Sequence, residues 1–233
     1  MNIPTDTLLD DFAIRSFRNI ADGDYVAARM ACRSQLAVQY LSASQQAIEK
    51  YLKCILLLRR IPATKVLHDL SAGLNAINNS GKLALGLTQP TEEFIAYLDR
   101  LGKFRYLEVS HHAFGHGLYS LDRAVWEVRR FCTLAPEPSL MVLREGQPPP
   151  KVALSGGELE SIIENVSHPA RAALLWQNGF FGRRVRKKVK IRNWLKASNA
   201  PLYLNPQILD DVINYVHLPK GLVAAYRAHK KPA

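Results

Sequence analysis

Residues 24–60, DYVAARMACRSQLAVQYLSASQQAIEKYLKCILLLRR, decide the fold of this chain. Along this stretch apolar side chains recur every three or four positions, with one small gap at Ser44, which is the spacing of one face of an α-helix. The stretch contains neither Gly nor Pro, and it ends in two arginines that suit the negative end of a helix dipole before Pro62 closes it. The pattern therefore predicts an amphipathic helix over 24–60 that needs a partner surface.

Three further segments before residue 135 carry helical spacing. A shorter helix is expected over 66–77, and the NNSGK that follows it is typical of a turn. Thr91, followed by two glutamates, marks the start of the next helix, with Thr91 as its cap. The helical period returns in 115–134, where Trp126 is expected to lie in the core. Four main helices are therefore expected in this half of the chain.

A proline-rich stretch separates this half from the rest. Residues 133–151 contain five of the chain's 13 prolines, a composition that cannot continue a helix and favours an extended, stiff connection. We therefore place a helical bundle at 5–135, a linker at 136–152 and a small basic unit at 153–233. Short helices are expected in the basic unit, where VRKKVKI (185–191) is the segment best able to pair as a strand.

The bulk composition excludes several classes of protein. At 233 residues and 48% apolar composition, the chain is long enough to bury one substantial core. No window approaches the roughly 20 uninterrupted apolar residues of a membrane span, and the N-terminus lacks the basic-then-apolar order of a secretory signal. Cys32, Cys54 and Cys132 are far apart and outside any CxxC pair. We therefore expect a cytoplasmic protein without a membrane partner, and with reduced, buried thiols.

The formal net charge of +11 is unevenly distributed. Residues 1–138 carry 16 Lys and Arg against 14 Asp and Glu, a net charge of +2. Residues 139–233 carry 15 against 6, a net charge of +9. The positive field therefore belongs to the C-terminal part, and its density favours an anionic partner.

Most of that charge lies in one segment, GRRVRKKVKIRNWLK (182–196), which has no acidic residue. Its eight basic residues are Arg183, Arg184, Arg186, Lys187, Lys188, Lys190, Arg192 and Lys196. Cations that neutralise phosphates release counterions, and Trp194, Phe180 and Phe181 would offer stacking surfaces for unpaired bases. RNA or single-stranded DNA is therefore the expected partner. A solvated basic face, an acidic protein partner and a membrane surface are the alternatives.

Several of these residues together resemble a HEPN domain. The stretch DYVAARMACRSQLAVQYLSASQQAIEKYLKCILL is followed by HDL (68–70), by FRYLE (104–108) and by LYSLDRAVWEVRRFC (118–132). The most specific piece is QQAIEKYLK, and the resemblance covers about residues 20–135. It implies an antiparallel bundle of four or five helices, a homodimer, and RNA or nucleotide binding, with ribonuclease activity in many members.

Two pieces of the resemblance also have a purely structural interpretation. In QQAIEKYLK, Glu49 and Lys53 form an i, i+4 pair in the favourable order on the outward face. The inward face is expected to hold Ala47, Ile48, Tyr51 and Leu52. In HDL, His68 is expected to bond to a neighbouring helix end and Asp69 to lie near exposed amides, with a nucleotide contact as the alternative.

The candidate catalytic residues are Arg105 with His111 or His112. Many HEPN ribonucleases carry an Arg, four to six intervening residues and a His, and RYLEVSHH fits this spacing with either histidine. Cleaving RNA without a metal requires a base with a pKa near 7 for the 2′-hydroxyl and a permanent cation for the phosphate, which His and Arg provide. On a helix, His112 would lie only about 20° around the axis from Arg105, so His112 is favoured.

Other interpretations of this motif remain open. Tyr106 follows Arg105, whereas catalytic members often have a small polar residue there. Leu107 replaces the Pro of an Arg-Tyr-Pro element that resembles members thought to bind nucleotides or to serve as partners. In a structural role, Arg105 would anchor a helix end or pair with Glu108 or Asp99.

The sequence thus predicts an all-α protein with two open functions. The first is a metal-independent endoribonuclease of toxin or defence type, in which Arg105 binds the scissile phosphate and His112 or His111 transfers protons. The second is a non-catalytic module that binds nucleic acid or nucleotide, with a nucleotidyltransferase-like protein as a possible partner. No cofactor is expected. No metal is expected either, because the Glu and two His spaced four apart over 108–116 cannot all converge on one ion.

Overall fold

The described part of the chain is mainly helical, which confirms the expected all-α class. The computed structural model describes residues 5–62, 66, 68–101, 112–115, 117–133, 157–182 and 195–198. The elements in chain order are α1 (Thr5–Ala13), the π-helix η1 (Ile14–Arg18), α2 (Asn19–Arg33), α3 (Ala37–Leu58), α4 (Leu70–Asn78), α5 (Gln89–Leu101), β1 (His112–Gly115), α6 (Gly117–Arg129), α7 (Glu158–Glu164), α8 (Arg171–Leu175) and β2 (Leu195–Ser198).

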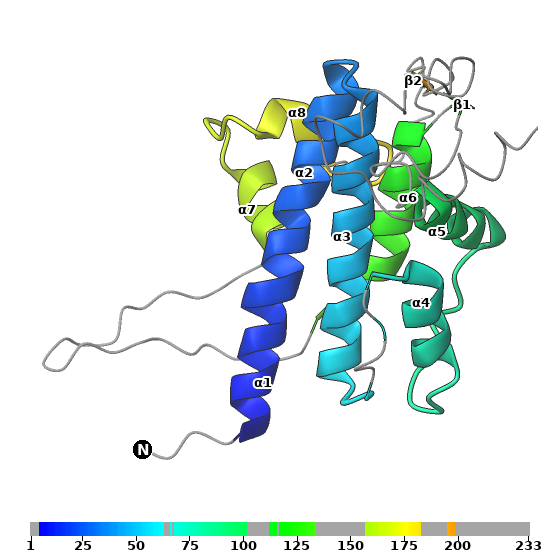
Figure 1. Cartoon of the computed structure of the whole chain (residues 1–233). Coiled ribbons are helices and arrows are strands. Elements are labelled where there is room, and N and C mark those ends of the chain that lie inside the picture. Colours follow the sequence, from blue (N-terminus) through cyan, green and yellow to red (C-terminus); the bar gives the residue numbers. More distant parts are fainter. Residues whose placement is uncertain are drawn as a thin grey trace, which may run out of the picture.

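The long helix α3 is the centre of the arrangement. It packs against α1, η1 and α2 on one side and against α4, α5 and α6 on the other, as Figure 1 shows. The two short strands pair with each other beside the start of α6. Among the described helices, none is both long enough and apolar enough to cross a membrane.

Residues 24–60 form a helical hairpin, so the single helix expected there is wrong. Gln35 lies between α2 and α3 with a φ of 61°, the left-handed conformation that reverses a chain. The amide of Leu36 donates to the carbonyl of Ala31 at 2.8 Å. The amide of Gln35 donates to the carbonyl of Cys32 at 3.1 Å. These two bonds form a Schellman cap, which usually has a glycine at its left-handed position, so the sequence pattern did not reveal the turn.

The C-terminal end of α3 closes in the same way and is tied to α1. Arg60 has a φ of 51°, and the amide of Ile61 donates to the carbonyl of Leu56 at 2.8 Å. The guanidinium of Arg60 donates to Asp10 at 2.7 Å and to Asp6 at 3.2 Å. One residue therefore both ends α3 and holds the first helix against it.

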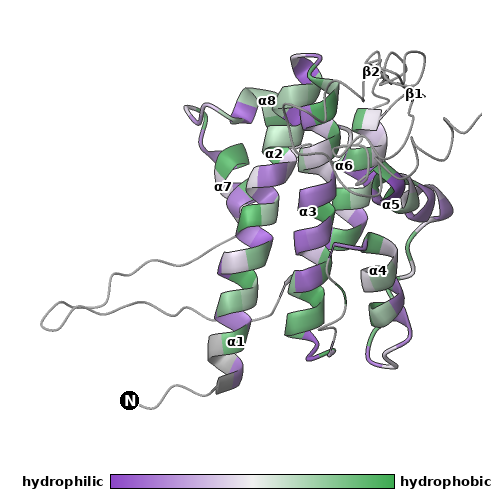
Figure 2. Ribbon diagram, in the orientation of Figure 1, coloured by the Kyte–Doolittle hydropathy of each residue, from purple (hydrophilic) through white to green (hydrophobic). Residues whose placement is uncertain are grey.

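The apolar face of α3 forms the middle of the core. The four residues predicted to face inward are all buried, with Ala47, Ile48 and Tyr51 at 0% exposure and Leu52 at 2%. Figure 2 shows hydrophilic and hydrophobic residues alternating along α3, as an amphipathic helix requires. Burying a large apolar side chain contributes about 1.5–3 kcal/mol, so this face accounts for much of the packing energy of the hairpin.

Helix α4 begins directly after its capping residue, Asp69. The expected helix over 66–77 starts later, at Leu70, because Asp69 accepts the amide of Ala72 at 2.6 Å and so caps the first turn. Asp99 of α5 accepts the amide of Leu70 at 2.9 Å. The structural role expected for Asp69 is thereby confirmed.

Helix α5 begins before Thr91, so the cap expected at Thr91 is wrong. Thr88 stands directly before the helix, and its amide and hydroxyl donate to Glu127 of α6 at 2.9 and 2.8 Å. Thr91 is buried at 0% exposure inside the first turn. A bond to a neighbouring helix therefore fixes the start of α5, and the local sequence does not show it.

Helices α7 and α8 pack into the same core as the bundle. Leu159, Ile162 and Leu174 belong to that core, with exposures of 0%, 3% and 0%. The proline-rich segment at 136–152 lies outside the described residues. The two helices that follow it nevertheless share a single core with α2, α3 and α6.

A buried cluster of ion pairs fixes α7. Arg129 of α6 donates to both carboxylate oxygens of Asp22 on α2, at 2.7 and 2.8 Å, and to both of Glu160 on α7, each at 2.7 Å. Asp22 is fully buried and also accepts the hydroxyl of Tyr51 at 2.6 Å. Burial acts against ionised Glu160, but the bonds and charge of Arg129 lower its pKa below the usual value. One guanidinium therefore joins three helices.

A second buried ion pair holds α8. Arg29 of α2 pairs with Asp122 of α6 and donates to the carbonyl of Ala173 at 3.0 Å. The hydroxyl of Tyr25 donates to Asp122 at 2.7 Å and accepts the side-chain amide of Asn178 at 3.0 Å. These groups bond to one another in place of water, although Oδ2 of Asp122 has no hydrogen-bond partner within the described residues.

The cysteines are buried free thiols, as expected from their spacing. Cys32, Cys54 and Cys132 each have 0% exposure. Cys132 donates weakly to the carbonyl of Tyr51, with 3.4 Å between sulfur and oxygen. Burial raises the pKa of the Cys132 thiol, which keeps it protonated and unreactive.

Candidate functional site

The predicted catalytic residues fall only partly within the described chain. Arg105 and His111 lie outside the described residues. His112 is the first residue of β1, so the chain there is a strand and not the helix assumed in comparing the two histidines. A strand advances about 3.3 Å per residue and a helix about 1.5 Å. The helical geometry on which His112 was favoured over His111 therefore does not hold at His112.

The end of the predicted basic segment pairs with the strand of His112. Lys196 lies in β2, which is antiparallel to β1. The register sets His112 opposite Ser198 and Phe114 opposite Lys196. The other predicted nucleic-acid contacts lie outside the described residues: Arg183, Arg184, Arg186, Lys187, Lys188, Lys190, Arg192 and Trp194. The strand expected at 185–191 also lies outside them.

The two-stranded ladder formed by β1 and β2 lies beside the N-termini of two helices. β2 contacts α3, and β1 ends at Gly115, just before α6 starts at Gly117. Figure 1 shows both strands beside the first turn of α6. Tyr40, in the first turn of α3, lies against Gly117, so the N-termini of α3 and α6 are neighbours. We call residues 37–40, 112–115, 117–120 and 195–198 the ladder end of the bundle.

The backbone at the ladder end favours anions. The first turns of α3 and α6 contain no acidic residue. Leu36, at the N-cap of α3, makes no side-chain capping bond. Amides in the first turn of a helix lack partners within it, and the helix dipole gives this end about half a positive charge. The N-termini of α3 and α6 therefore both lie near β2, the strand that contains the last residue of the basic segment.

Tyr40 is a residue of the ladder end that sequence reasoning missed. It is 1% exposed, and within the described chain its hydroxyl has no hydrogen-bond partner. Tyr25 and Tyr51 are equally buried, and their hydroxyls bond to carboxylates at 2.7 and 2.6 Å. A buried hydroxyl without a partner costs about 1–3 kcal/mol. A tyrosine in an apolar stripe looks the same in sequence whether or not its hydroxyl is bonded, so no signal marks Tyr40.

Phe181 does not lie open for stacking on bases, so the prediction for this residue is wrong. Phe181 is 6% exposed and packs against Trp126, with ring centres 5.3 Å apart. Phe180 is half-buried against Tyr119, with ring centres also 5.3 Å apart. Trp126, expected in the core, is 38% exposed and lies over this cluster. The two phenylalanines that come directly before the basic segment therefore pack against α6.

Polar side chains of QQAIEKYLK and HDL contact other residues of the bundle. Lys53 donates to Glu49 at 2.7 Å, which confirms the predicted i, i+4 pair. Nδ1 of His68 lies 3.1 Å from the carboxylate of Glu49. The expected contact of His68 with a helix end is thus replaced by one with the middle of α3. Lys50 pairs with Asp24 across the hairpin.

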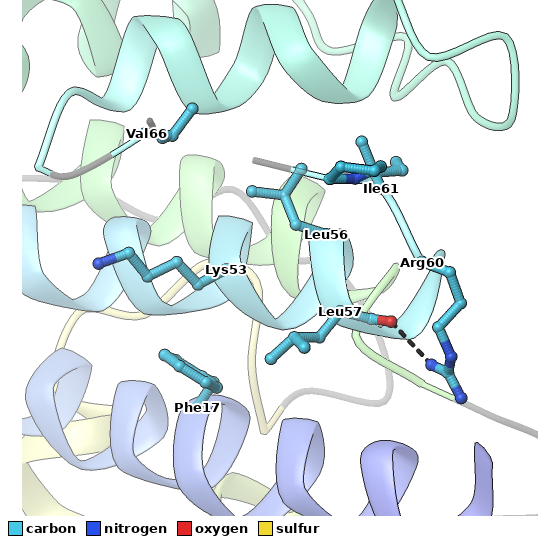
Figure 3. A pocket seen from close by; sticks show the side chains of 8 residues that line it. Phe17, Lys53, Leu56, Leu57, Arg60, Ile61 and Val66 are labelled. Atoms are coloured by element: carbon cyan, nitrogen blue, oxygen red, sulfur yellow. Dashed lines mark hydrogen bonds between the residues drawn. The ribbon is translucent and has the colours of Figure 1, made fainter. Parts of the chain in front are cut away.

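A cavity of about 510 Å³ lies at the other end of α3, between η1 and the chain that follows α3 (Figure 3). Its lining is mainly apolar: Phe17, Lys53, Leu56, Leu57, Arg60, Ile61, Pro62 and Val66. Both cations of the lining are already paired, Lys53 with Glu49 and Arg60 with Asp6 and Asp10. The cavity therefore offers no uncompensated positive charge to a phosphate, and none of the predicted site residues lines it.

Metal binding finds no support in the described ranges. No three His, Cys, Asp or Glu side chains there gather closely enough to hold a metal ion. Of the three side chains spaced four apart over 108–116, two lie outside the described residues.

Compared with protein-family models, with curated proteins and with solved structures, the chain matches none of them. The resemblance to a HEPN domain therefore rests on the quoted residues alone, and what it implies about function is a proposal.

Proposed function

We propose that this chain is a HEPN-like protein that binds RNA or a nucleotide at the ladder end of its bundle. The observation that supports the proposal is the pairing of β1 with β2, which sets the strand of His112 beside the strand of Lys196. Lys196 is the last of eight basic residues in a segment without an acidic one. The pairing therefore anchors one end of that segment beside two helix N-termini, and phosphate is the group that both features favour.

The charge distribution supports a polymeric or multiply charged ligand. Residues 139–233 carry a net charge of +9, which far exceeds what a single phosphate needs. Each phosphate contact on a single strand contributes about 0.7 to the slope of binding against salt. The HEPN resemblance adds a homodimer to this proposal and, in its non-catalytic version, a nucleotidyltransferase-like partner.

A metal-independent endoribonuclease is the second candidate function. It is favoured by the register of the ladder, in which His112 and Lys196 occupy diagonal positions. Diagonal positions of an antiparallel pair lie on one face, about 7–8 Å apart. In this version Arg105 binds the scissile phosphate, and His112 or His111 takes the proton of the 2′-hydroxyl.

Binding is tested with a labelled single-stranded RNA at several salt concentrations. We expect a variant with Arg186→Gln, Lys187→Gln and Lys188→Gln to bind about tenfold or more weakly than the wild type, with a slope against salt reduced by about 2. The matched control carries Lys82→Gln, Arg100→Gln and Arg130→Gln, which remove the same charge from exposed positions on the bundle. Equal losses in both variants, or no binding by the wild type, would overturn the proposal.

Catalysis is tested separately, with the same RNA in EDTA. The wild type is compared with Arg105→Ala and with a His111→Ala/His112→Ala double variant, and the folding of each is checked by circular dichroism. Cleavage that both variants lose would establish a metal-independent ribonuclease. Salt-sensitive binding without cleavage of this and several other RNAs would leave the non-catalytic module.

A further inference from the structure

One buried hydroxyl at the ladder end faces a helix N-terminus. Tyr40 is 1% exposed, and its hydroxyl has no hydrogen-bond partner within the described residues. A Cβ atom placed on Gly117, the first residue of α6, would lie only 2.9 Å from this hydroxyl oxygen. The hydroxyl therefore packs closely against the start of α6, and a side chain at this position would have to displace Tyr40.

The first turn of α6 has the properties of an anion site. The helix spans 13 residues, and its first turn, GLYS, contains no acidic side chain. Gly117, Tyr119 and Ser120 are half-buried, so this turn is partly exposed to solvent. Amides at a helix start have no partner within the helix, and the dipole favours a negative group there. The Tyr40 hydroxyl adds a further donor directed at the same turn.

We propose that the Tyr40 hydroxyl and the first-turn amides of α6 together bind one phosphate group of the RNA or nucleotide. The inference rests on the proposed function and names a phosphate contact within the same site. The hydroxyl donates to one phosphate oxygen, and the amides donate to the others. At Gly117 no side chain stands between the Tyr40 hydroxyl and the first-turn amides.

The nearby charges are compatible with an anion. Asp122 lies on α6 and its charge acts on Tyr40; Arg29 pairs with its Oδ1 and offsets that charge, while its Oδ2 has no hydrogen-bond partner within the described residues. Burial raises the pKa of Tyr40 well above its usual value, so the hydroxyl remains a donor at neutral pH. A phosphate diester offers acceptors only, and a neutral phenol matches it.

The test compares Tyr40→Phe with Tyr51→Phe. Both substitutions remove one buried hydroxyl from α3, but the hydroxyl of Tyr51 is already bonded to Asp22. The wild type and both variants are titrated with labelled single-stranded RNA, and their Tm is measured in inorganic phosphate against chloride of the same ionic strength. We expect Tyr40→Phe to fold at least as stably as the wild type, because its hydroxyl has no partner to lose. We expect Tyr51→Phe to be less stable.

Phosphate should raise the Tm of the wild type and of Tyr51→Phe, and should leave Tyr40→Phe unchanged. RNA should bind Tyr40→Phe about tenfold more weakly, as the loss of one hydrogen bond to a charged group predicts. If Tyr40→Phe responds to phosphate and RNA like the wild type, the inference fails while RNA binding stands. If the wild type binds no RNA but responds to phosphate through Tyr40, RNA binding fails and a free phosphate or nucleotide site remains. A wild type that responds to neither ligand overturns both.

Discussion

At the scale of single residues, two side chains occupy backbone conformations that usually select glycine. Gln35 has a φ of 61° and Arg60 a φ of 51°. A left-handed conformation costs a residue with a side chain roughly 1–2 kcal/mol, whereas glycine adopts it freely. We therefore expect Gln35→Gly to raise the free energy of unfolding by about 0.5–1 kcal/mol, measured by denaturant unfolding.

Arg60→Gly is the matched control for that prediction. It relieves the same backbone conformation but also removes the bonds to Asp6 and Asp10. We expect it to give no net gain in stability. If both glycine variants gained equally, the ion pairs of Arg60 would have no role in holding α1.

The stability of the protein should depend on pH through Glu160. Burial opposes ionisation of this residue, but Arg129 bonds to both of its oxygens and lowers its pKa below the usual value of about 4.3. A carboxylate with a lowered pKa contributes stability above the unfolded-state pKa and loses it as the pH falls through the folded-state pKa. We therefore expect the Tm of the wild type to fall more steeply below about pH 5 than that of Glu160→Gln.

Glu164→Gln on the same helix provides the comparison. Glu164 is exposed, and the partners of Arg129 are Asp22 and Glu160, so this variant should keep the pH profile of the wild type. Identical profiles for the wild type and Glu160→Gln would contradict a stabilising Glu160–Arg129 pair.

At the scale of helices and strands, the sequence predicts those helices whose position depends on a single apolar face. α6 was predictable, and so was the helical conformation of the residues that form α3, because each carries a long apolar stripe. The turn at Gln35 was not, because its cap uses backbone bonds and no glycine. The start of α5 was not, because a bond from Thr88 to another helix sets it. Local propensity cannot report contacts of this kind.

The candidate site, too, was only partly predictable from the sequence. The residue types at His112 and in the basic segment could be chosen from their chemistry and spacing alone. Their pairing could not, because β1 is four residues long, HAFG, and its partner is distant in the sequence. Tyr40 matters through the missing partner of its hydroxyl, which only the packing of α3 against α6 reveals.

Arg129 should control the attachment of α7. It is 8% exposed and bonds to Asp22, which is fully buried. Removing one partner of a buried ion pair typically costs about 3–5 kcal/mol, because the other charge stays buried and unpaired. We expect Arg129→Met to lose stability on this scale, with faster hydrogen exchange of the α7 amides. Combining it with Asp22→Asn should recover part of the loss, since the unpaired charge is then absent.

The neighbouring Arg130 provides the control for this measurement. It is exposed, so Arg130→Met should leave both stability and the exchange of α7 close to those of the wild type. If Arg129→Met lowers stability while the α7 amides exchange as in the wild type, the ion pairs do not fix α7.

At the scale of the whole molecule, the bundle of 5–133 is incomplete without 157–182. Leu159, Ile162 and Leu174 are buried in the common core, and Arg29 bonds to the carbonyl of Ala173. Each large buried side chain contributes about 1.5–3 kcal/mol, and a typical domain is stable by only about 5–15 kcal/mol. Loss of α7 and α8 therefore removes a large share of the net stability.

Two shortened chains test this and separate folding from binding. We expect a chain of residues 1–133 to lose cooperative thermal unfolding, because its core is exposed and the carbonyl partner of Arg29 is gone. A chain of residues 1–182 keeps α7, α8 and Phe181 and should unfold cooperatively. It lacks the basic residues that begin at Arg183, so its affinity for single-stranded RNA should fall far more than its Tm. Cooperative unfolding of the 1–133 chain would show that the bundle does not need α7 and α8 in order to fold. Full RNA affinity of the 1–182 chain would show that the RNA-binding surface lies within residues 1–182.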